Sequence, residues 1–178
     1  MRYKVFSVPE IDCDAKGKVT VCDIAKDKLA SRIKVLEVRM KEKVKSIEDA
    51  EVIVVAGSAV KKAEDLELIK RLADKLGGMV AVTRPLIEAG LADPRLQVGL
   101  SGRTVKPKLI ITCGVAGAIQ FVAGMDKSDY IVAINTDETA PIFNVAHYAI
   151  VGDMFEIIPK LIQQLDTKAN AAATKSVC

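Results

Sequence analysis

A short apolar run followed by glycines constrains the fold of this chain more than any other feature. The run is Leu109–Cys113, and a turn of small residues, 114–118, separates it from an expected helix. This order is typical of the βα crossover of a parallel sheet. Glycines let a ligand approach the backbone, and the free N–H groups of a helix N-terminus attract anions. A second small-residue turn at 98–102 favours a nucleotide or cofactor cleft over an ordinary tight turn.

Further apolar segments between residues 51 and 165 alternate with helical patterns. We expect strands over 51–58, 79–84, 109–113 and 130–135, and a short one near Ala149. Apolar residues at three- and four-residue steps predict a helix over 62–77, and shorter patterns predict helices at 85–90, 118–124 and 153–165. This alternation predicts an α/β fold with a doubly wound parallel sheet, whose ligands bind beyond the carboxyl ends of the strands.

The residues at these strand ends are small, polar or cationic, as a cofactor cleft requires. They are Gly57 and Ser58, Thr83 and Arg84, residues 114–120, Asn135, and Asp153 after the last strand. No nucleophile–base pair and no carboxylate dyad is visible in the sequence, so a hydrolase has no support and no catalytic residue is expected.

Residues 1–50 do not share this pattern. Segments 16–24 and 31–41 alternate partly as β-strands do, but no helix separates them. We expect an extended β arm or a small edge hairpin that holds another domain or subunit. The net charge of +3 arises here, because residues 1–50 contain 12 Lys and Arg against 9 Asp and Glu. The charges alternate in sign as on a solvated face, so no nucleic-acid partner is expected.

Several classes of protein lack support in this sequence. No apolar stretch approaches the roughly 20 residues of a membrane span, so no membrane insertion is expected. The four cysteines lack the spacing of metal ligands or redox pairs, which predicts free thiols in a reducing compartment and no metal site. Near the C-terminus, Pro159 is expected to kink or divide the last helix, and residues 166–178 are expected to form a disordered tail.

The motifs at the strand ends resemble those of one family. They are Thr83-Arg84, QVGLSG at 97–102, LIITCGVAGAIQFVAG at 109–124, IVAINTDETAPIF at 131–143 and YAIVGD at 148–153. In order and spacing they resemble the C-terminal FAD-binding domain of the electron transfer flavoprotein alpha subunit over residues 51–165. The arm at 1–50 resembles the segment that links this domain to the family's N-terminal domain, so we expect the chain to be a fragment, with a shortened stand-alone paralogue as the alternative.

The resemblance implies a Rossmann-like domain of the deoxyhypusine-synthase type with six strands, across whose ends an FAD lies extended. Carried over by position, Arg84 lies against the isoalloxazine ring and Ser101 reaches its N5 atom. Residues 98–102 wrap the ring, residues 116–120 cradle the pyrophosphate and ribityl chain, and Asn135 and Asp153 bind the adenosine end. The full implied cofactor set is Thr83, Arg84, Val98, Gly99, Leu100, Ser101, Gly102, Ala116, Gly117, Ala118, Ile119, Gln120, Phe121, Asn135, Asp153 and Met154.

The chain departs from the family pattern at several of these positions. Phe121 stands where the family usually has a histidine that donates a hydrogen bond near the flavin C2=O. Ser58 stands where the family has an arginine that faces the phosphates, and Leu100 and Ala116 replace polar residues. These changes remove a charge and hydrogen bonds to the cofactor, so weaker FAD binding is expected. His147 is interpreted as structural or surface-exposed.

The function that the resemblance implies is electron transport rather than stand-alone catalysis. The implied partners are the beta subunit, which completes the FAD site, and flavoproteins of the acyl-CoA dehydrogenase type. The implied location is the cytoplasm of a bacterium or archaeon, or the mitochondrial matrix of a eukaryote. One alternative is a degenerate relative that has lost flavin and serves as an interaction module. An NAD-binding enzyme of the same fold is disfavoured, because no GxGxxG follows the first strand and no acidic residue ends the second.

Overall fold

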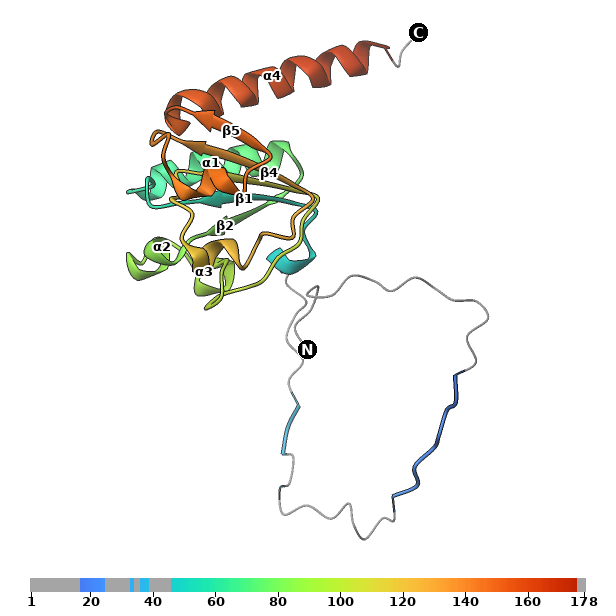
Figure 1. The fold of residues 1–178 in the computed structure, drawn as a ribbon. Coiled ribbons are helices and arrows are strands. Elements are labelled where there is room, and N and C mark those ends of the chain that lie inside the picture. The colour runs from blue at the N-terminus through green and yellow to red at the C-terminus, as the bar shows by residue number, and fades with distance from the viewer. Residues whose placement is uncertain (1–16, 25–32, 34–35, 39–45, 176–178) are drawn as a thin grey trace. The chain divides into compact units, whose positions relative to one another are not determined.

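The computed structural model describes residues 17–24, 33, 36–38 and 46–175 (Figure 1). The chain divides into two units, of which residues 6–44 form the smaller. The described residues of that unit contain no helix or strand, and Val19 and Val21 are almost fully exposed. The strand expected over 16–24 is therefore wrong for residues 17–24. A β-type segment needs a hydrogen-bonded neighbour, and the sequence pattern does not reveal whether one is present. The rest of the predicted arm lies largely outside the described residues.

The larger unit is a three-layer α/β domain. Its parallel strands are β1 (Val52–Ala56), β2 (Met79–Val82), β3 (Leu109–Cys113), β4 (Tyr130–Asn135) and β5 (Tyr148–Val151). Its helices are α1 (Ala63–Lys75), α2 (Arg84–Glu88), α3 (Ile119–Val122) and α4 (Met154–Lys175), with 3₁₀ turns η2 (Ile47–Asp49), η3 (Pro94–Leu96) and η4 (Pro141–Asn144). The predicted α/β fold with a parallel, doubly wound, Rossmann-like sheet is confirmed.

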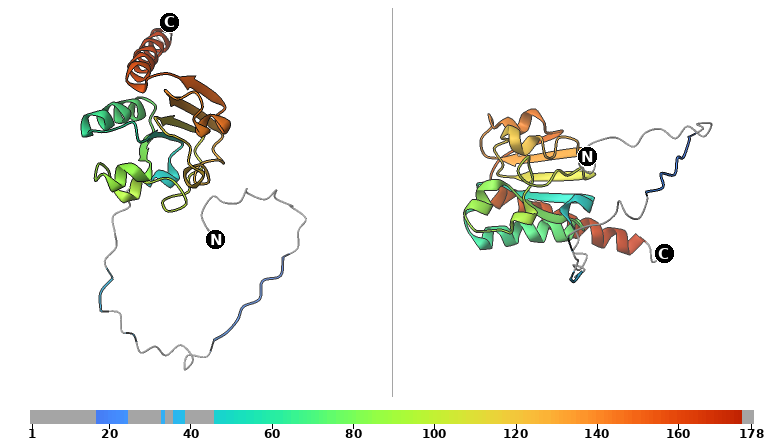
Figure 2. Two further views of the ribbon diagram at one scale, coloured as in Figure 1. Left: turned by 60° about the vertical axis from the view of Figure 1, so that its left-hand side comes forward. Right: turned by 90° about the horizontal axis from the view of Figure 1, so that it is seen from below.

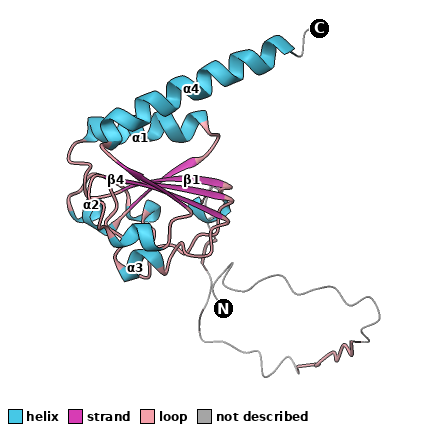
Figure 3. Ribbon diagram, turned by 45° about the horizontal axis from the view of Figure 1, so that its top comes forward, coloured by secondary structure: helices cyan, strands magenta, loops and turns pink. Residues whose placement is uncertain are grey.

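The strand order is β2-β1-β3-β4-β5. Among the described residues the sheet has five strands, one fewer than the six that the resemblance implies. Figure 3 shows the sheet edge-on, with α1 and α4 on one face and α3 with several loops on the other. The chain leaves β1 toward β2 on one side and later returns to β3 on the other side. The order therefore places a topological switch point between the carboxyl ends of β1 and β3.

Both faces of the sheet are covered, which explains the continuous apolar runs of the central strands. Ile53 and Val55 pack into the core under α3 and η4, whereas Val54 and Ala56 face the opposite core. That second core contains Ile69 and other apolar residues of α1 and α4, which lie side by side (Figure 2).

The last helix is longer than its sequence pattern predicts. α4 continues to Lys175, so the prediction of a disordered tail is wrong for residues 166–175, and Pro159 does not divide the helix. Pro159 removes one hydrogen bond, but buried Ile158 and Ile162 hold this part of α4 in the core. The segment beyond residue 165 is rich in alanine, the best helix former.

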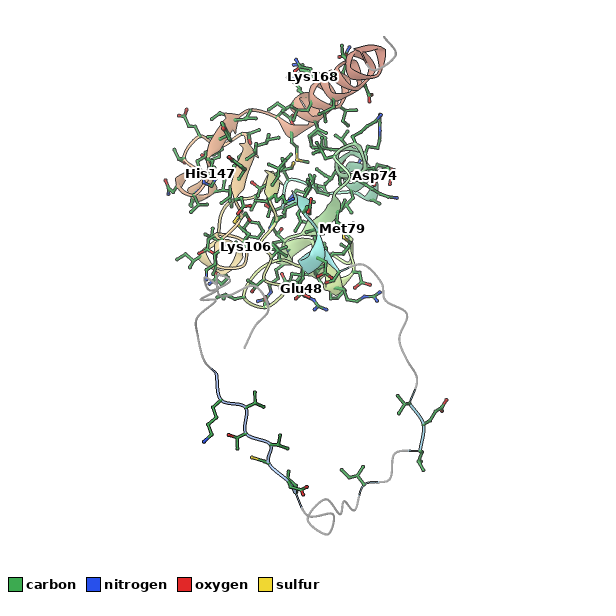
Figure 4. The ribbon with its side chains drawn as sticks, turned by 90° about the vertical axis from the view of Figure 1, so that its right-hand side faces the viewer. Glu48, Asp74, Met79, Lys106, His147 and Lys168 are labelled. Carbon is green, nitrogen blue, oxygen red and sulfur yellow. The ribbon has the colours of Figure 1, made fainter. Side chains whose placement is uncertain are left out.

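His147, the residue just before β5, supports the sheet through hydrogen bonds to β4. Its Nδ1 accepts a hydrogen bond from the Ile131 N–H at 2.9 Å, and its own N–H donates to the Ile131 carbonyl at 2.8 Å. The imidazole thus takes the place of a strand carbonyl beside β4, away from β2 and its Met79 (Figure 4). The interpretation of His147 as a structural residue is confirmed.

Cys113 is expected to resist alkylation in the folded protein. Complete burial at the end of β3 raises the pKa of its thiol from 9.0 to about 12, so almost no thiolate forms near neutral pH. Exposed Cys22 should react under the same conditions. Iodoacetamide labelling followed by peptide mass spectrometry checks this, with urea-unfolded protein as the control in which both thiols react. Equal labelling of both thiols in the native protein would contradict the burial of Cys113.

Candidate functional site

Two pockets open along the carboxyl edge of the sheet. The first has a volume of about 470 Å³ and lies at the ends of β1, β2 and β3. The second has a volume of about 280 Å³ and lies at the ends of β1, β3, β4 and β5. Ser58 and Ala116 line both, so the two pockets form one groove that crosses the switch point between β1 and β3. We call it the switch-point groove. Its position is the one where doubly wound sheets bind nucleotides.

The glycines at the floor of this groove are required by contacts between loops. A Cβ on Gly57 would lie 2.1 Å from the carbonyl oxygen of Gly114, and one on Gly114 would lie 2.3 Å from the Cβ of Ala59. The turns after β1 and β3 therefore touch through backbone atoms. Their glycines are needed for this packing in addition to any role in admitting a ligand.

Gly117 has the most demanding geometry of the loop between β3 and α3. Its φ of +93° is rarely adopted by other residues, and a Cβ there would lie 2.2 Å from the backbone nitrogen of Ile142 in η4. The Ile142 N–H donates to the Ala116 carbonyl at 3.1 Å, which ties η4 to the same loop. Packing and hydrogen bonding against η4 therefore hold this loop in place.

Consecutive backbone donors face no protein acceptor in this loop. Among the described residues, no side chain or carbonyl accepts a hydrogen bond from the N–H groups of residues 116–120. Backbone donors are nearly always paired with protein, water or ligand, and four of these five belong to residues that line the first pocket, where a ligand could accept from them. The predicted helix at 118–124 is shorter, since α3 spans only Ile119–Val122. The unpaired N–H groups thus belong mainly to the loop before α3, and not to the N-terminus of a longer helix as the sequence predicts.

The loop at 97–103 forms one wall of the first pocket. Its ends are joined because the Arg103 N–H donates to the Gln97 carbonyl at 2.7 Å and the Gly99 N–H donates to the Arg103 carbonyl at 3.1 Å. The Leu100 N–H donates to the Gln120 carbonyl at 2.9 Å, which joins this loop to α3. Inside the loop, the Gln97 side-chain amide donates to Ser101 Oγ at 2.8 Å.

Arg84 stands at the mouth of the first pocket as the first residue of α2. Its Nε donates to Glu88 Oε1 at 2.8 Å, one turn along the helix, which leaves the terminal guanidinium nitrogens to face solvent or a ligand. Thr83 is buried, and its hydroxyl donates to the Ala56 carbonyl at 3.4 Å. Thr83 therefore joins β2 to β1, while Arg84 supplies an exposed positive charge.

The second pocket is more polar and its walls are held by side-chain bonds. Asn135 donates to the Val115 carbonyl at 2.9 Å and accepts from the Asp137 N–H at 3.0 Å, so it connects the loops after β3 and β4. Hydrogen bonds from Thr139 lower the pKa of the Asp137 carboxyl. Asp153 caps α4 by accepting from the Phe155 N–H at 2.8 Å. Lys61 adds a positive charge to this lining.

The structure brings most of the predicted site residues to the switch-point groove. Thr83, Arg84, Val98, Gly99, Leu100, Ser101, Ala116, Gly117, Ala118, Gln120 and Phe121 line the first pocket, and Asn135, Asp153, Met154 and again Ala116 line the second. Gly102 and Ile119 line neither pocket. Ile119 is 80% exposed on α3, and Gly102 packs against the backbone of Gln97.

Sequence reasoning missed several residues that line the groove. The most informative are Gln97 in the first pocket and Lys61 in the second. Ser58, which lines both pockets, was expected at the cleft from its position two residues after β1, although it is not in the implied cofactor set. Nothing in the local pattern distinguishes Gln97 or Lys61 from other polar residues. In the part of the chain that the structure describes, no helix is long and apolar enough to cross a membrane, and no cluster of side chains could hold a metal ion.

Comparisons with known proteins agree on one family. Residues 46–126 match the model of the electron transfer flavoprotein FAD-binding domain. The chain is 52% identical over 99% of its length to the lactate dehydrogenase (NAD(+),ferredoxin) subunit LctC of Acetobacterium woodii, covering 42% of that protein. It is 40% identical over 97% of its length to the electron transfer flavoprotein subunit alpha of Megasphaera elsdenii, covering 52%. It is 50% identical over 75% of its length to protein FixB of Clostridium saccharobutylicum, covering 40%. The chain thus spans about half the length of these curated relatives or less.

Proposed function

Because residues 46–126 belong to the electron transfer flavoprotein FAD-binding domain family, we propose that the chain binds FAD along the switch-point groove and carries electrons as part of an alpha subunit. The observation that carries the proposal is the position of this groove. It crosses the carboxyl ends of the strands at the switch point and offers the free backbone donors of residues 116–120.

The residues of the groove fit the two ends of an extended FAD. The first pocket is lined largely by apolar and backbone atoms around Val98, Val115 and Phe121, which suits a flat aromatic ring system. Ala116, Gly117, Ala118 and Gln120 line the first pocket, and Ala116 also lines the second, so their unpaired N–H groups suit the ribityl and phosphate oxygens. The second pocket holds Lys61, whose positive charge suits phosphate oxygens, and Asp153, whose carboxylate can accept hydrogen bonds from ribose hydroxyls.

FAD, when bound, supplies the redox chemistry, and the protein supplies charge and hydrogen bonds. The positive charge of the Arg84 guanidinium would favour negative charge on the ring of a bound, reduced FAD. Ser101 offers a hydroxyl hydrogen bond to the ring edge. Asp153 orients sugar hydroxyls, and Asn135 holds the loops around them. We propose no proton-transferring or nucleophilic residue, so the chain acts as an electron carrier and not as a stand-alone catalyst.

The proposed partners are a beta subunit, which completes the FAD site, and a flavoprotein that delivers electrons. The names of several relatives describe them as alpha subunits, which supports the first partner. A dehydrogenase of the acyl-CoA type is one proposed electron donor. The 52% identity to a subunit of a lactate dehydrogenase favours a second candidate, a flavoprotein that oxidises a 2-hydroxy acid. The buried free thiol of Cys113 is compatible with a reducing compartment such as the bacterial cytoplasm.

Titration of the purified chain with FAD tests the proposal. We expect saturable quenching of flavin fluorescence with a dissociation constant in the micromolar range or below, and no displacement by NAD⁺. Absence of binding to the chain and also to its complex with a beta subunit would favour the flavin-free interaction module. Displacement of bound flavin by NAD⁺ would instead favour a nicotinamide-binding protein of the same fold.

Replacing Phe121 with histidine is expected to have two opposite effects. Phe121 is 5% exposed and packs with Val98 and Ile142, so a buried imidazole should lower the stability of the FAD-free chain by about 1–3 kcal/mol. In the FAD-bound chain, the new donor should make the reduced flavin bind more tightly relative to the oxidised flavin. Urea unfolding measures the first effect and a potentiometric titration the second. The control is Phe121→Leu, and equal potentials in both variants would contradict a contact between residue 121 and the flavin.

A further inference from the structure

Gln97 occupies an unusual place for a glutamine. It is 8% exposed, lines the first pocket, and directs its side-chain amide to Ser101 Oγ at 2.8 Å. Burial of a long polar side chain costs free energy unless its hydrogen bonds are satisfied. The hydrogen bond to Ser101 therefore offsets part of the cost of burying this amide. Gln97 begins the QVGLSG motif, but the resemblance assigns its side chain no role in cofactor binding.

The backbone around Gln97 leaves its side chain little freedom. Its carbonyl accepts from the Arg103 N–H at 2.7 Å, and its N–H donates to the Pro94 carbonyl at 3.2 Å. Gly102 packs against the same residue, since a Cβ on Gly102 would lie 2.3 Å from the Gln97 carbonyl oxygen and 3.0 Å from its Cγ. Gly102 therefore supports Gln97, which explains its place in the QVGLSG motif although it does not line the groove.

The direction of the Gln97–Ser101 hydrogen bond fixes what Ser101 can do. A hydroxyl has one hydrogen to donate and lone pairs with which to accept. Because Ser101 Oγ accepts from the Gln97 amide, its own hydrogen is not used on Gln97. The other described hydrogen bonds leave that hydrogen without a protein acceptor, so it is available to an acceptor atom in the pocket.

We propose that Gln97 is a positioning residue that holds Ser101 as a hydrogen-bond donor toward the flavin ring. This inference rests on the proposed function. A carboxylate at position 97 would do the opposite, because it can only accept and would take the hydrogen of Ser101 for itself. Gln97→Glu therefore keeps the size and shape of the side chain while reversing the direction of the hydrogen bond.

A double-mutant cycle on the reduction potential of bound FAD tests this role. The variants are Gln97→Met, Ser101→Ala and the double variant, with exposed Gln164→Met on α4 as control. We expect Gln97→Met and Ser101→Ala each to change the ratio of reduced-flavin to oxidised-flavin affinity about tenfold and in the same direction, roughly 30 mV for two electrons. The double variant should change it no further than either single variant, and the control should leave it unchanged. Gln97→Glu should change it at least as much as Ser101→Ala and in the same direction.

The outcomes separate this inference from the proposed function. If the unaltered chain and its complex with a beta subunit bind no FAD, the proposed function fails and the inference falls with it. If FAD binds and the effects of the two single changes add in the double variant, Gln97 acts independently of Ser101 and only the inference fails. If Gln97→Met does not fold, an unchanged potential in Gln97→Glu still overturns the inference.

Discussion

Replacing Gly117 with alanine is expected to weaken FAD binding at least a hundredfold while leaving the sheet folded. The new Cβ would lie 2.2 Å from the Ile142 nitrogen at a φ of +93°, so the loop must move away from η4. That movement displaces the N–H donors of residues 116–120, on which the proposed phosphate contacts depend. We expect at least a hundredfold loss of FAD affinity, about 2.7 kcal/mol, and a loss of stability of about 1–3 kcal/mol.

Gly77→Ala is the matched control for Gly117→Ala. Gly77 has a φ of +64°, but no atom lies within 4 Å of its would-be Cβ, and it lies at the C-terminal end of α1 away from the groove. The exchange should cost about 1 kcal/mol of stability and leave FAD affinity unchanged. Isothermal titration and thermal unfolding of both variants measure the two effects. Wild-type FAD affinity in a folded Gly117→Ala variant would show that the loop is not a binding element.

Removing the charge of Arg84 is expected to affect reduced FAD far more than oxidised FAD. The guanidinium lines the first pocket, where its positive charge would stabilise the negative charge that a bound flavin gains on reduction. Arg84→Met should weaken the binding of reduced flavin about 10- to 100-fold relative to oxidised flavin, which corresponds to about 1.4–2.7 kcal/mol and lies within the range for one charge pair.

Arg95→Met serves as the control, because Arg95 is an exposed arginine on η3 that pairs with Asp93 and does not line the groove. Potentiometric titration of both variants with bound FAD measures the effect. An equal reduction potential in Arg84→Met and the unaltered chain would rule out contact between the guanidinium and the redox-active ring.

The architecture of the domain was predictable because its information is local. Runs such as Leu109–Cys113 are apolar at every position except Thr112, and the structure buries them between two layers. The limits of the elements were less predictable. Residues 166–175 read as a polar tail, yet their helix propensity extends α4. Segment 16–24 reads as a strand, but β-structure depends on a partner that local sequence does not identify.

The residues of the groove were predictable where they lie at the ends of strands. They were not predictable where their role depends on contacts that form only in the folded loop. Arg84 lies two residues after β2 and Asn135 is the last residue of β4, so topology alone brings them to one edge. The roles of Gly102 and Gln97 depend on one side chain packing and bonding within a folded loop. Asn135 was expected to bind the adenosine end, and its bonds to Val115 and Asp137 add a role in holding the loops together.

Nuclear magnetic resonance of the ¹⁵N-labelled chain during FAD titration tests the central claim most directly. Binding along the switch-point groove predicts large shifts for the amides of residues 116–120, because their free N–H groups acquire acceptors. The amide of Gly77 should not shift, since it lies away from the groove. Saturable FAD binding with unshifted resonances for residues 116–120 would contradict the claim and would place the flavin elsewhere on the chain.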